Sequence, residues 1–271
     1  MTVPTKSSWE AAVLRLRNQP DQRRLVEACF YDDPLLVAAQ RYLACSEWRA
    51  VRALIGVGPG RALDVGAGRG IATFALAHDN WQVTALEPDP SAVVGAAAIR
   101  ALAQEAGLSV NVVEEWGEQL PFEGGRFAVV HCRQVLHHAR DLSRLCGEVA
   151  RVLSPGGVLL ATREHVISSR DDLSRFLGGH PLHKFYGGEN AYTIEEYLDA
   201  IRGAGLIVES VLNPLESDIN AYPDSLADIK RRWARKAYLP SAAFIPNAAL
   251  SWLGGRLNTP GRLFTFLARK P

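Results

Sequence analysis

The sequence predicts an α/β fold built on a doubly wound parallel sheet, and two observations support this prediction. Short apolar runs rich in Val, Leu and Ala alternate along the chain with segments of helical period. A glycine-rich turn follows the first run and leads directly into a helical segment. Strands that alternate with helices form a parallel sheet covered on both faces. The apolar runs lie at 61–65, 82–87, 110–114, 126–132 and 158–163.

Composition indicates a soluble globular protein and argues against several classes of function. Of the 271 residues, 48% are hydrophobic and 22% are charged, which is enough for one large domain or a domain with an appendage. The net charge of +1 argues against a dedicated nucleic-acid binder. The four cysteines form no CxxC pair, which favours reduced thiols over a zinc ribbon or a disulfide framework. No stretch approaches the roughly 18 apolar residues of a membrane span. No signal-like N-terminal pattern is present, so a cytoplasmic location is expected.

Residues 1–60 are expected to form a helical cap. Trp48, Val51 and Leu54 recur at helical spacing and predict an amphipathic helix over about 35–55. Just before this helix lies Tyr31, which is a candidate for substrate contact; a helix-capping turn is the alternative interpretation of its segment.

Capping residues set the expected helix boundaries in the central part of the chain. A helix over 91–106 is expected to begin at Ser91. The Ser-Pro-Gly-Gly sequence at 154–157 is expected to end a second helix and turn the chain into the next strand. Thr193 and Glu196 have the spacing of a capping box and predict the start of a third helix.

The strongest functional pattern lies directly after the first predicted strand. Asp64 precedes Gly66, Gly68 and Gly70 in the segment LDVGAGRG. Glycines allow a tight turn and a close approach of the backbone to a ligand, and the following helix offers free N–H groups. Glu87 stands 19 residues beyond Gly68, at the end of the next strand, where an acid can bind ribose hydroxyls. The pattern therefore predicts a nucleoside-containing cofactor.

The spacing of these glycines distinguishes two cofactor classes. A dinucleotide fingerprint is G-x-G-x-x-G, but its sixth position here is Ile71, and the third glycine stands one residue earlier. The observed G-x-G-x-G pattern, with Asp64 two residues before the first glycine, is similar to motif I of the class I S-adenosylmethionine-dependent methyltransferases. A nicotinamide-dependent oxidoreductase is the less favoured alternative.

Further segments resemble the type 11, or ubiquinone/menaquinone-biosynthesis-like, subgroup of this family and occur in the family's order. They are Glu87-Pro88-Asp89, the QLPF segment at 119–122, residues 127–138 and the turn at 153–157. The resemblance covers roughly residues 61–163. It implies a seven-stranded Rossmann-like sheet of order 3-2-1-4-5-7-6, S-adenosylmethionine as cofactor and S-adenosylhomocysteine as product. The domain plan is a helical cap at 1–60, a cofactor-binding core at 61–213, a helical insertion or lid at 214–261 and a final core strand at 262–271.

The resemblance also implies a set of cofactor-binding residues, with one departure from the subgroup's pattern. The subgroup commonly has an acid four positions before its LPF segment, but here Trp116 stands there, beside Glu115. Either Glu115 takes that role or the indole packs on the adenine; a Trp that caps the sheet edge is the alternative. The expected cofactor-binding residues are Asp64, Gly66, Ala67, Gly68, Gly70, Glu87, Pro88, Glu115, Trp116, Cys132, Arg133 and His137.

Histidines near the predicted carboxyl edge of the sheet are candidates for acid–base chemistry. A sulfonium methyl group is already electrophilic, so a general base is needed only for a protonated acceptor such as a hydroxyl. His165 follows the fifth strand and is the first choice as base, with His183 second. The residues expected to contact substrate are Tyr31, His138, His180 and Tyr186.

The stretch at 178–190 is rich in glycine, aromatic and polar residues and is expected to form a loop over the site. It contains a His-x-x-His pair at His180 and His183. Spacing places no third ligand, and Pro181 argues against a helical pair, so no metal is expected.

The segment 214–261 has two interpretations. It holds a basic run and two apolar stretches, which favour either a solvated helix face with core residues, or a lid or surface that meets an anionic or lipid-linked acceptor. The run at 262–268 looks like the family's antiparallel strand beside the fifth.

The expected function is methyl transfer to a small-molecule acceptor. Oxygen is favoured because the histidine-rich loop supplies a base; carbon and nitrogen stay open. A non-methylating or non-catalytic relative that binds the same cofactor is the main alternative.

Overall fold

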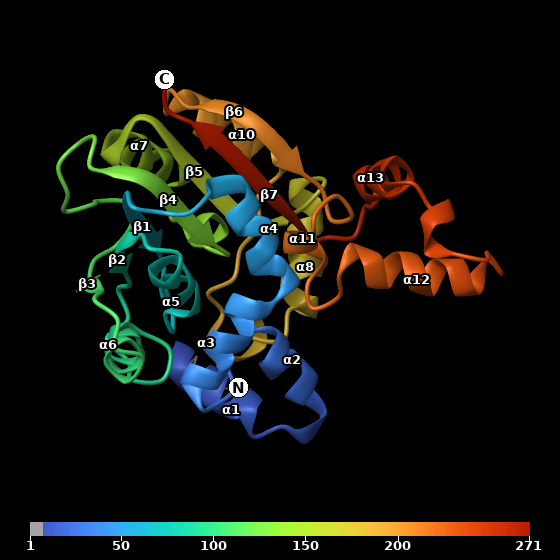
Figure 1. Cartoon of the computed structure of the whole chain (residues 1–271), viewed down its shortest axis with the longest axis horizontal. Coiled ribbons are helices and arrows are strands. Elements are labelled where there is room, and N and C mark those ends of the chain that lie inside the picture. The colour runs from blue at the N-terminus through green and yellow to red at the C-terminus, as the bar shows by residue number, and fades with distance from the viewer. Residues whose placement is uncertain (1–7) are drawn as a thin grey trace.

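The computed structural model describes residues 8–271 and contains one seven-stranded sheet, which runs through the centre of the molecule (Figure 1). The strand order is β3-β2-β1-β4-β5-β7-β6, and β7 runs antiparallel to both of its neighbours. The predicted fold class and strand order are therefore confirmed. The strands are β1 (Arg61–Val65), β2 (Gln82–Leu86), β3 (Asn111–Val113), β4 (Phe127–Arg133), β5 (Leu153–Val166), β6 (Ile207–Leu212) and β7 (Arg262–Arg269).

Helices cover both faces of the sheet, because neighbouring residues of a strand point to opposite sides. Ala62 packs in the core that α3, α4 and α5 form, whereas Leu63 packs in the core that α7 and α10 form. The α-helices are α1 (Trp9–Arg17), α2 (Arg23–Ala28), α3 (Leu35–Ala44), α4 (Ser46–Ile55), α5 (Ile71–His78), α6 (Ala96–Glu105), α7 (Leu142–Val152), α8 (Leu173–Gly179), α9 (His183–Tyr186), α10 (Ile194–Gly203), α11 (Asp218–Ala221), α12 (Leu226–Lys236) and α13 (Asn247–Arg256).

The helical cap before the sheet consists of α1 to α4. The single helix predicted over 35–55 is wrong, because the chain breaks at Cys45, whose backbone is extended. The Cys45 thiol instead caps α4 by accepting the N–H of Trp48 at 3.4 Å. The first residues of the predicted cap, 1–7, lie outside the described residues.

Two other predicted boundaries, the starts of α6 and of β5, are wrong, and two, the end of α7 and the start of α10, are confirmed. Helix α6 begins at Ala96, because the Ser91 hydroxyl accepts the N–H groups of Val93 and Val94 and closes a turn ahead of the helix. Helix α7 ends at Val152, as predicted, but the 154–157 segment already belongs to β5, which begins at Leu153 rather than at 158. The capping box that opens α10 is present as predicted.

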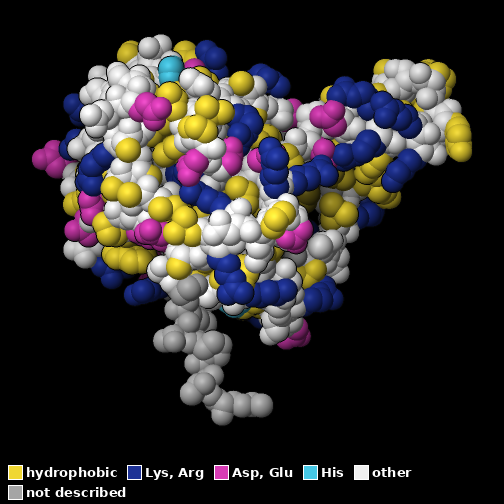
Figure 2. Space-filling model, turned by 90° about the horizontal axis from the view of Figure 1, so that it is seen from below, with side chains coloured by type: hydrophobic (Ala, Val, Ile, Leu, Met, Phe, Trp, Pro, Cys, Tyr) yellow, Lys and Arg dark blue, Asp and Glu magenta, His cyan; other side chains and the backbone are white. Residues whose placement is uncertain are grey.

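Helices α12 and α13 project from the body of the protein as an arm, which we define as residues 226–257 (Figure 1). Figure 2 shows Lys and Arg side chains along this projection and apolar side chains at its outer end. Three aromatic side chains of the arm are strongly exposed: Tyr238 at 95%, Phe244 at 65% and Trp252 at 57%. Across residues 8–271, no helix is both long and apolar enough to span a bilayer.

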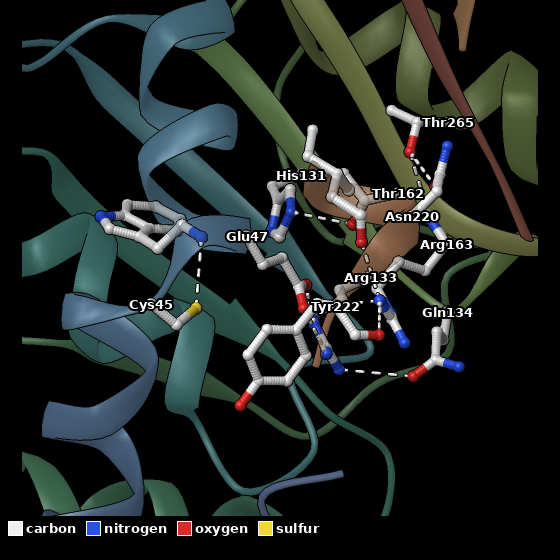
Figure 3. Close-up of polar contacts among 12 residues, drawn as sticks. Cys45, Glu47, His131, Arg133, Gln134, Thr162, Arg163, Asn220, Tyr222 and Thr265 are labelled. Atoms are coloured by element: carbon white, nitrogen blue, oxygen red, sulfur yellow. Dashed lines mark hydrogen bonds and ion pairs between the residues drawn. The ribbon is translucent and has the colours of Figure 1, made fainter. Parts of the chain in front are cut away.

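A buried ionic network joins the cap, the sheet and the segment after β6 (Figure 3). The Glu47 carboxylate of α4 accepts hydrogen bonds from Nε and Nη2 of Arg133 at 2.6 and 3.0 Å. Nη1 of Arg163 lies 3.8 Å from Glu47 and donates to the carbonyls of Ile219 and Tyr222. Burial opposes ionisation of Glu47, but the charges of Arg133 and Arg163 outweigh it and hold its pKa below the usual value.

We expect Glu47→Gln to lower the free energy of unfolding by about 3–5 kcal/mol, because two largely buried guanidinium groups lose their counter-charge. Urea denaturation measures this loss. Glu209→Gln is the matched control, since it breaks an exposed pair with Arg269 and should cost less than about 1 kcal/mol. Equal losses in the two variants would contradict the organising role of Glu47.

Candidate active site

The glycine turn between β1 and α5 has the backbone shape that its sequence predicts. Gly66, Gly68 and Gly70 have φ angles of +60°, +56° and +84°, in the left-handed region that favours glycine. A Cβ atom at Gly66 would lie 2.7 Å from Cγ2 of Val135. A Cβ at Gly68 would meet only the carbonyl oxygen of Val94, 4.0 Å away. Gly68 therefore faces open space at the carboxyl end of β1.

Asp64 and Ala67 hold this turn in place. The buried Asp64 carboxylate accepts the hydroxyl of Thr73 at 2.6 Å and lies 3.2 Å from Nδ1 of His131. The N–H of Ala67 donates to the carbonyl of Leu86 at 3.1 Å, which ties the turn to β2.

Glu87 lies beside the turn, directly after β2, and the half-buried Pro88 follows it. Its two carboxylate oxygens accept the N–H groups of Gly68 at 2.7 Å and Asp89 at 3.0 Å. Burial raises the pKa of Glu87 to about 7, although these two N–H groups act in the opposite direction. A carboxylate in this position can accept hydrogen bonds from a pair of ribose hydroxyls.

Four of the expected cofactor residues lie outside the glycine turn itself, although Cys132 pairs with Val65, directly before the turn. The side chain of Cys132 is buried in the hydrophobic core, and Arg133 pairs with Glu47. Glu115 is exposed, and the mostly exposed Trp116 ring lies 5.3 Å from the guanidinium of Arg140. Contact of any of these four side chains with the cofactor stays a prediction.

Histidines from three segments gather around the buried carboxylate of Glu189. Nε2 of His137 and Nε2 of His138 lie 3.6 and 3.9 Å from Oε2 of Glu189, and Nδ1 of His180 lies 3.8 Å from Oε1. The Tyr186 hydroxyl donates to Oε1 at 2.8 Å. Together with His165, whose ring lies 4.7 Å from that of His137, these histidines and Glu189 are named the histidine–glutamate cluster.

A second buried carboxylate, Glu164, fixes the loop after β4. It accepts the N–H groups of Val135, Leu136 and His137 at 3.0–3.1 Å and lies 2.7 Å from Nδ1 of His137. Burial lowers the pKa of His137, but hydrogen bonds to Glu164 and Glu189 outweigh that effect and raise it to about 9. Because Val135 also lies against Gly66, one carboxylate positions both the cofactor turn and the first histidine of the cluster.

His165, the predicted base, lies near the end of β5, beside an irregularity in its pairing with β7 between Ala161 and Glu164. Its Nδ1 is 2.9 Å from the carbonyl of Gly261, and a carbonyl can only accept, so Nδ1 carries the hydrogen. Burial and the neighbouring His137 lower the pKa of His165 to about 3. The ring is therefore neutral at pH 7, with Nε2 unprotonated, and it is a weak base.

The loop predicted before α10 is partly wrong, because α8 and α9 occupy much of it. His183 begins α9, and its N–H lies 3.4 Å from Nδ1 of His180. The rings of Tyr31 and Tyr186 both pack on Trp9 of the cap, with centroids 5.8 and 4.7 Å away. Packing against the cap thus gives this glycine-rich segment its helical turns.

Sequence reasoning missed the two glutamates that organise the site. Glu164 is a charged residue that directly follows the apolar run at 158–163 and still lies within β5, and a buried charge is a signal of a specific partner. Glu189 had no comparable signal, because it stands among polar residues and glycines.

Comparison with known proteins identifies the domain that holds the glycine turn. Residues 63–161 match the family model described as "Methyltransferase domain". The chain carries a class I S-adenosylmethionine-dependent methyltransferase domain of the type 11 group. The cofactor of this family is S-adenosylmethionine, and its nucleoside fits the open approach at Gly68 and the paired oxygens of Glu87.

Two relatives of this methyltransferase domain share the same description. The ubiquinone biosynthesis O-methyltransferase of Azorhizobium caulinodans is 29% identical over 114 residues, which are 42% of this chain and 43% of that protein. The protein of that name from Methylobacterium sp. strain 4-46 is 27% identical over 171 residues, 60% of this chain and 68% of that one. The chain thus spans less than half of the first relative and about two thirds of the second.

Solved structures share the fold of this methyltransferase domain over most of the chain. Geranyl diphosphate C-methyltransferase from Streptomyces coelicolor A3(2) has a TM-score of 0.63 and 16% identity, with 99% of this chain and 100% of that chain covered. The (4+2)-cyclase SpnF has a TM-score of 0.57 and 24% identity, with 86% of this chain and 81% of that chain covered.

We expect Gly68→Val to weaken S-adenosylhomocysteine binding by at least about tenfold, because the new side chain fills the approach to the turn. Isothermal titration calorimetry measures the affinity. Gly107→Val is the matched control, since Gly107 has a φ of +66° with open space around it and lies after α6. It carries the same backbone strain and should bind normally; normal binding by Gly68→Val would refute the assigned site.

Binding of S-adenosylhomocysteine should strengthen as the pH rises through about 7, where Glu87 loses its proton. Only the ionised carboxylate can accept hydrogen bonds from both ribose hydroxyls. Calorimetry across this pH range, in buffers of different ionisation enthalpy, measures the protons exchanged on binding. Below about pH 7, binding of S-adenosylhomocysteine should release a proton from Glu87. Glu87→Gln should bind more weakly and lose this pH dependence; a variant that keeps it would show that another group is responsible.

Proposed function

We propose that this protein transfers the methyl group of S-adenosylmethionine to a hydroxyl oxygen of a small-molecule acceptor. The observation that supports this most is the link between the two halves of the site: Glu164 holds Val135, which lies against Gly66, and His137, which belongs to the histidine–glutamate cluster. A methyl group presented at the glycine turn would therefore lie near a buried set of proton acceptors.

The methyl group passes directly from the cofactor to the acceptor, so the protein itself need not form a covalent bond to either. The bond from sulfur to methyl breaks as the bond from oxygen to methyl forms, and the hydroxyl proton leaves the acceptor. Alignment and the exclusion of water are the protein's main tasks, and the cluster is largely buried. We assign the departing proton first to Nε2 of His165, with His183 as the second choice.

The weak basicity of His165 favours one kind of hydroxyl. A ring whose pKa is lowered to about 3 cannot readily remove a proton from an aliphatic alcohol. A phenolic hydroxyl, with a pKa of about 10 in tyrosine, ionises far more easily. The name shared by the two relatives, ubiquinone biosynthesis O-methyltransferase, agrees with oxygen as the methylated atom.

We further propose that the arm meets an anionic or lipid-linked part of the acceptor. Its residues 226–257 include six basic and one acidic side chain. Basic residues lie along α12, and apolar side chains are exposed toward the outer end of the arm (Figure 2). Basic and apolar groups in this arrangement suit a surface that carries negative charge and hydrocarbon.

We also propose a cytoplasmic location, because the four free cysteines fit a reducing compartment.

An acceptor panel tests this proposal directly. The protein is incubated with S-adenosylmethionine and soluble phenols, phenols with an isoprenoid tail, aliphatic alcohols and amines, and methylated product is measured by mass spectrometry. Product from phenols, with the tailed forms preferred, is the expected result. Tight cofactor binding without product from any acceptor would instead support a non-methylating relative.

His165→Ala should lower turnover by about 10²–10⁴-fold, the usual contribution of a group that handles a proton in the transition state. Affinity for S-adenosylhomocysteine should stay within about twofold, because the glycine turn and Glu87 are untouched. His78→Ala, at the end of α5 and outside the cluster, is the control and should leave both quantities unchanged. Unchanged turnover in His165→Ala would remove this residue from the mechanism.

A further inference from the structure

Three members of the histidine–glutamate cluster have the geometry of a metal centre. One ligand atom from each of His137, His165 and Glu189 lies within 4.8 Å of the other two, and all three side chains are buried. They come from the loop after β4, from β5 and from the segment before α10. Only the folded chain brings these three side chains together, so local sequence does not explain why their ligand atoms lie so close to one another.

In both histidines, Nδ1 already makes the hydrogen bond that the second ring nitrogen of a metal-binding histidine usually makes. Such a residue normally donates its second ring N–H to a carboxylate or a backbone carbonyl, which fixes the ring and frees the other nitrogen. Nδ1 of His137 lies 2.7 Å from the Glu164 carboxylate, and Nδ1 of His165 lies 2.9 Å from the carbonyl of Gly261. Nε2 is thereby the nitrogen available for a ligand in each ring.

The third ligand is oriented in a comparable way. The hydroxyl of Tyr186 donates to Oε1 of Glu189 at 2.8 Å. Oε2 is the oxygen that faces the imidazoles, 3.6 Å from Nε2 of His137. An ion with bonds of about 2.1 Å keeps neighbouring ligand atoms roughly 3–4 Å apart, so small side-chain rotations would close the site.

The charge around the cluster also calls for a cation. Glu164 and Glu189 are both buried, and within residues 8–271 their only ion-pair partners are histidines, with no lysine or arginine. Buried carboxylates are normally paired or bound to a metal, because their desolvation is costly. Protonated His137 supplies one positive charge between them, and one dication that displaces its Nε2 proton would match the charge of both carboxylates.

We propose that His137, His165 and Glu189 bind one divalent transition-metal ion, such as Zn²⁺ or Fe²⁺. Two imidazoles and a carboxylate suit these ions, whereas Mg²⁺ and Ca²⁺ prefer oxygen ligands. The site differs from the His-x-x-His pair considered in the sequence, because His183 is not part of it. His138 and His180 flank Glu189 at 3.9 and 3.8 Å and can supply a further nitrogen.

The ion's use in catalysis rests on the proposed function. A bound divalent ion lowers the pKa of an oxygen ligand and orients it. An acceptor hydroxyl on the ion would then ionise without a strong base. Because Nε2 of His165 would be a ligand of the ion, the hydroxyl proton would pass instead to His183, the second choice as base. Binding of the ion is a separate claim and is tested without cofactor or acceptor.

The test titrates the chelator-treated full chain with Co²⁺, whose visible absorption reports coordination by nitrogen and oxygen, and then displaces it with Zn²⁺. The expected result is one ion per chain, tight Zn²⁺ binding by calorimetry and no binding of Mg²⁺ at the same concentration. His165→Ala and Glu189→Gln should each weaken Zn²⁺ binding by at least about tenfold. His78→Ala is the control and should bind as the unmodified chain does.

Circular dichroism and thermal melts show whether each variant is folded, and Glu189→Gln, which keeps the shape of its side chain, serves if His165→Ala is not. Absence of the cobalt spectrum from the unmodified chain, or equal Zn²⁺ affinity in Glu189→Gln and His78→Ala, would overturn the metal site. Neither outcome bears on methyl transfer, which the acceptor panel measures independently.

Discussion

The helical cap, the central sheet and the segment after β6 are joined by a network centred on one buried carboxylate, that of Glu47. Glu47 of the cap accepts hydrogen bonds from Arg133 of β4 and lies beside Arg163 of β5, which in turn holds the carbonyls of Ile219 and Tyr222 (Figure 3). Charges buried this deeply are stable only when paired, so each group fixes the others. Because Arg133 and Arg163 lie near the carboxyl ends of their strands, the network sets the cap and the segment after β6 at the edge of the sheet where the site lies.

Three further glutamates each position a different part of the site. Glu87 positions the glycine turn, Glu164 positions the loop after β4, and Glu189 draws the histidines together. None of the three has a lysine or arginine as an ion-pair partner among residues 8–271; Glu87 and Glu164 are satisfied chiefly by backbone N–H groups. Such carboxylates keep their acceptor capacity for ligands: ribose hydroxyls at Glu87 and, in our proposal, a cation at Glu189.

The two halves of the site have different standing relative to known proteins. The match to the methyltransferase family ends at residue 161, so it contains the glycine turn and Glu87 but stops short of His165, His180 and Glu189. The cofactor half thus belongs to the shared domain. The proposed acceptor half is built from the end of β5, from the segment before α10 and from cap residues that pack on it. We attribute acceptor choice to this second half.

The strands of the sheet and the cofactor turn could be predicted from the sequence alone, because they depend on local patterns: apolar runs, glycines with positive φ and an acid at a strand end. The order of the strands was predicted only through the resemblance to the methyltransferase family. It misplaced the break at Cys45 and the start of α6, where single side chains cap the backbone. It could not reveal Glu189 as the centre of the histidines, or Glu164 as the anchor of the loop after β4. The contacts of the loop after β4 with these two glutamates join residues 27 to 52 positions apart in the chain, and only the packing of β4, β5 and the segment before α10 brings them within hydrogen-bond or ion-pair distance.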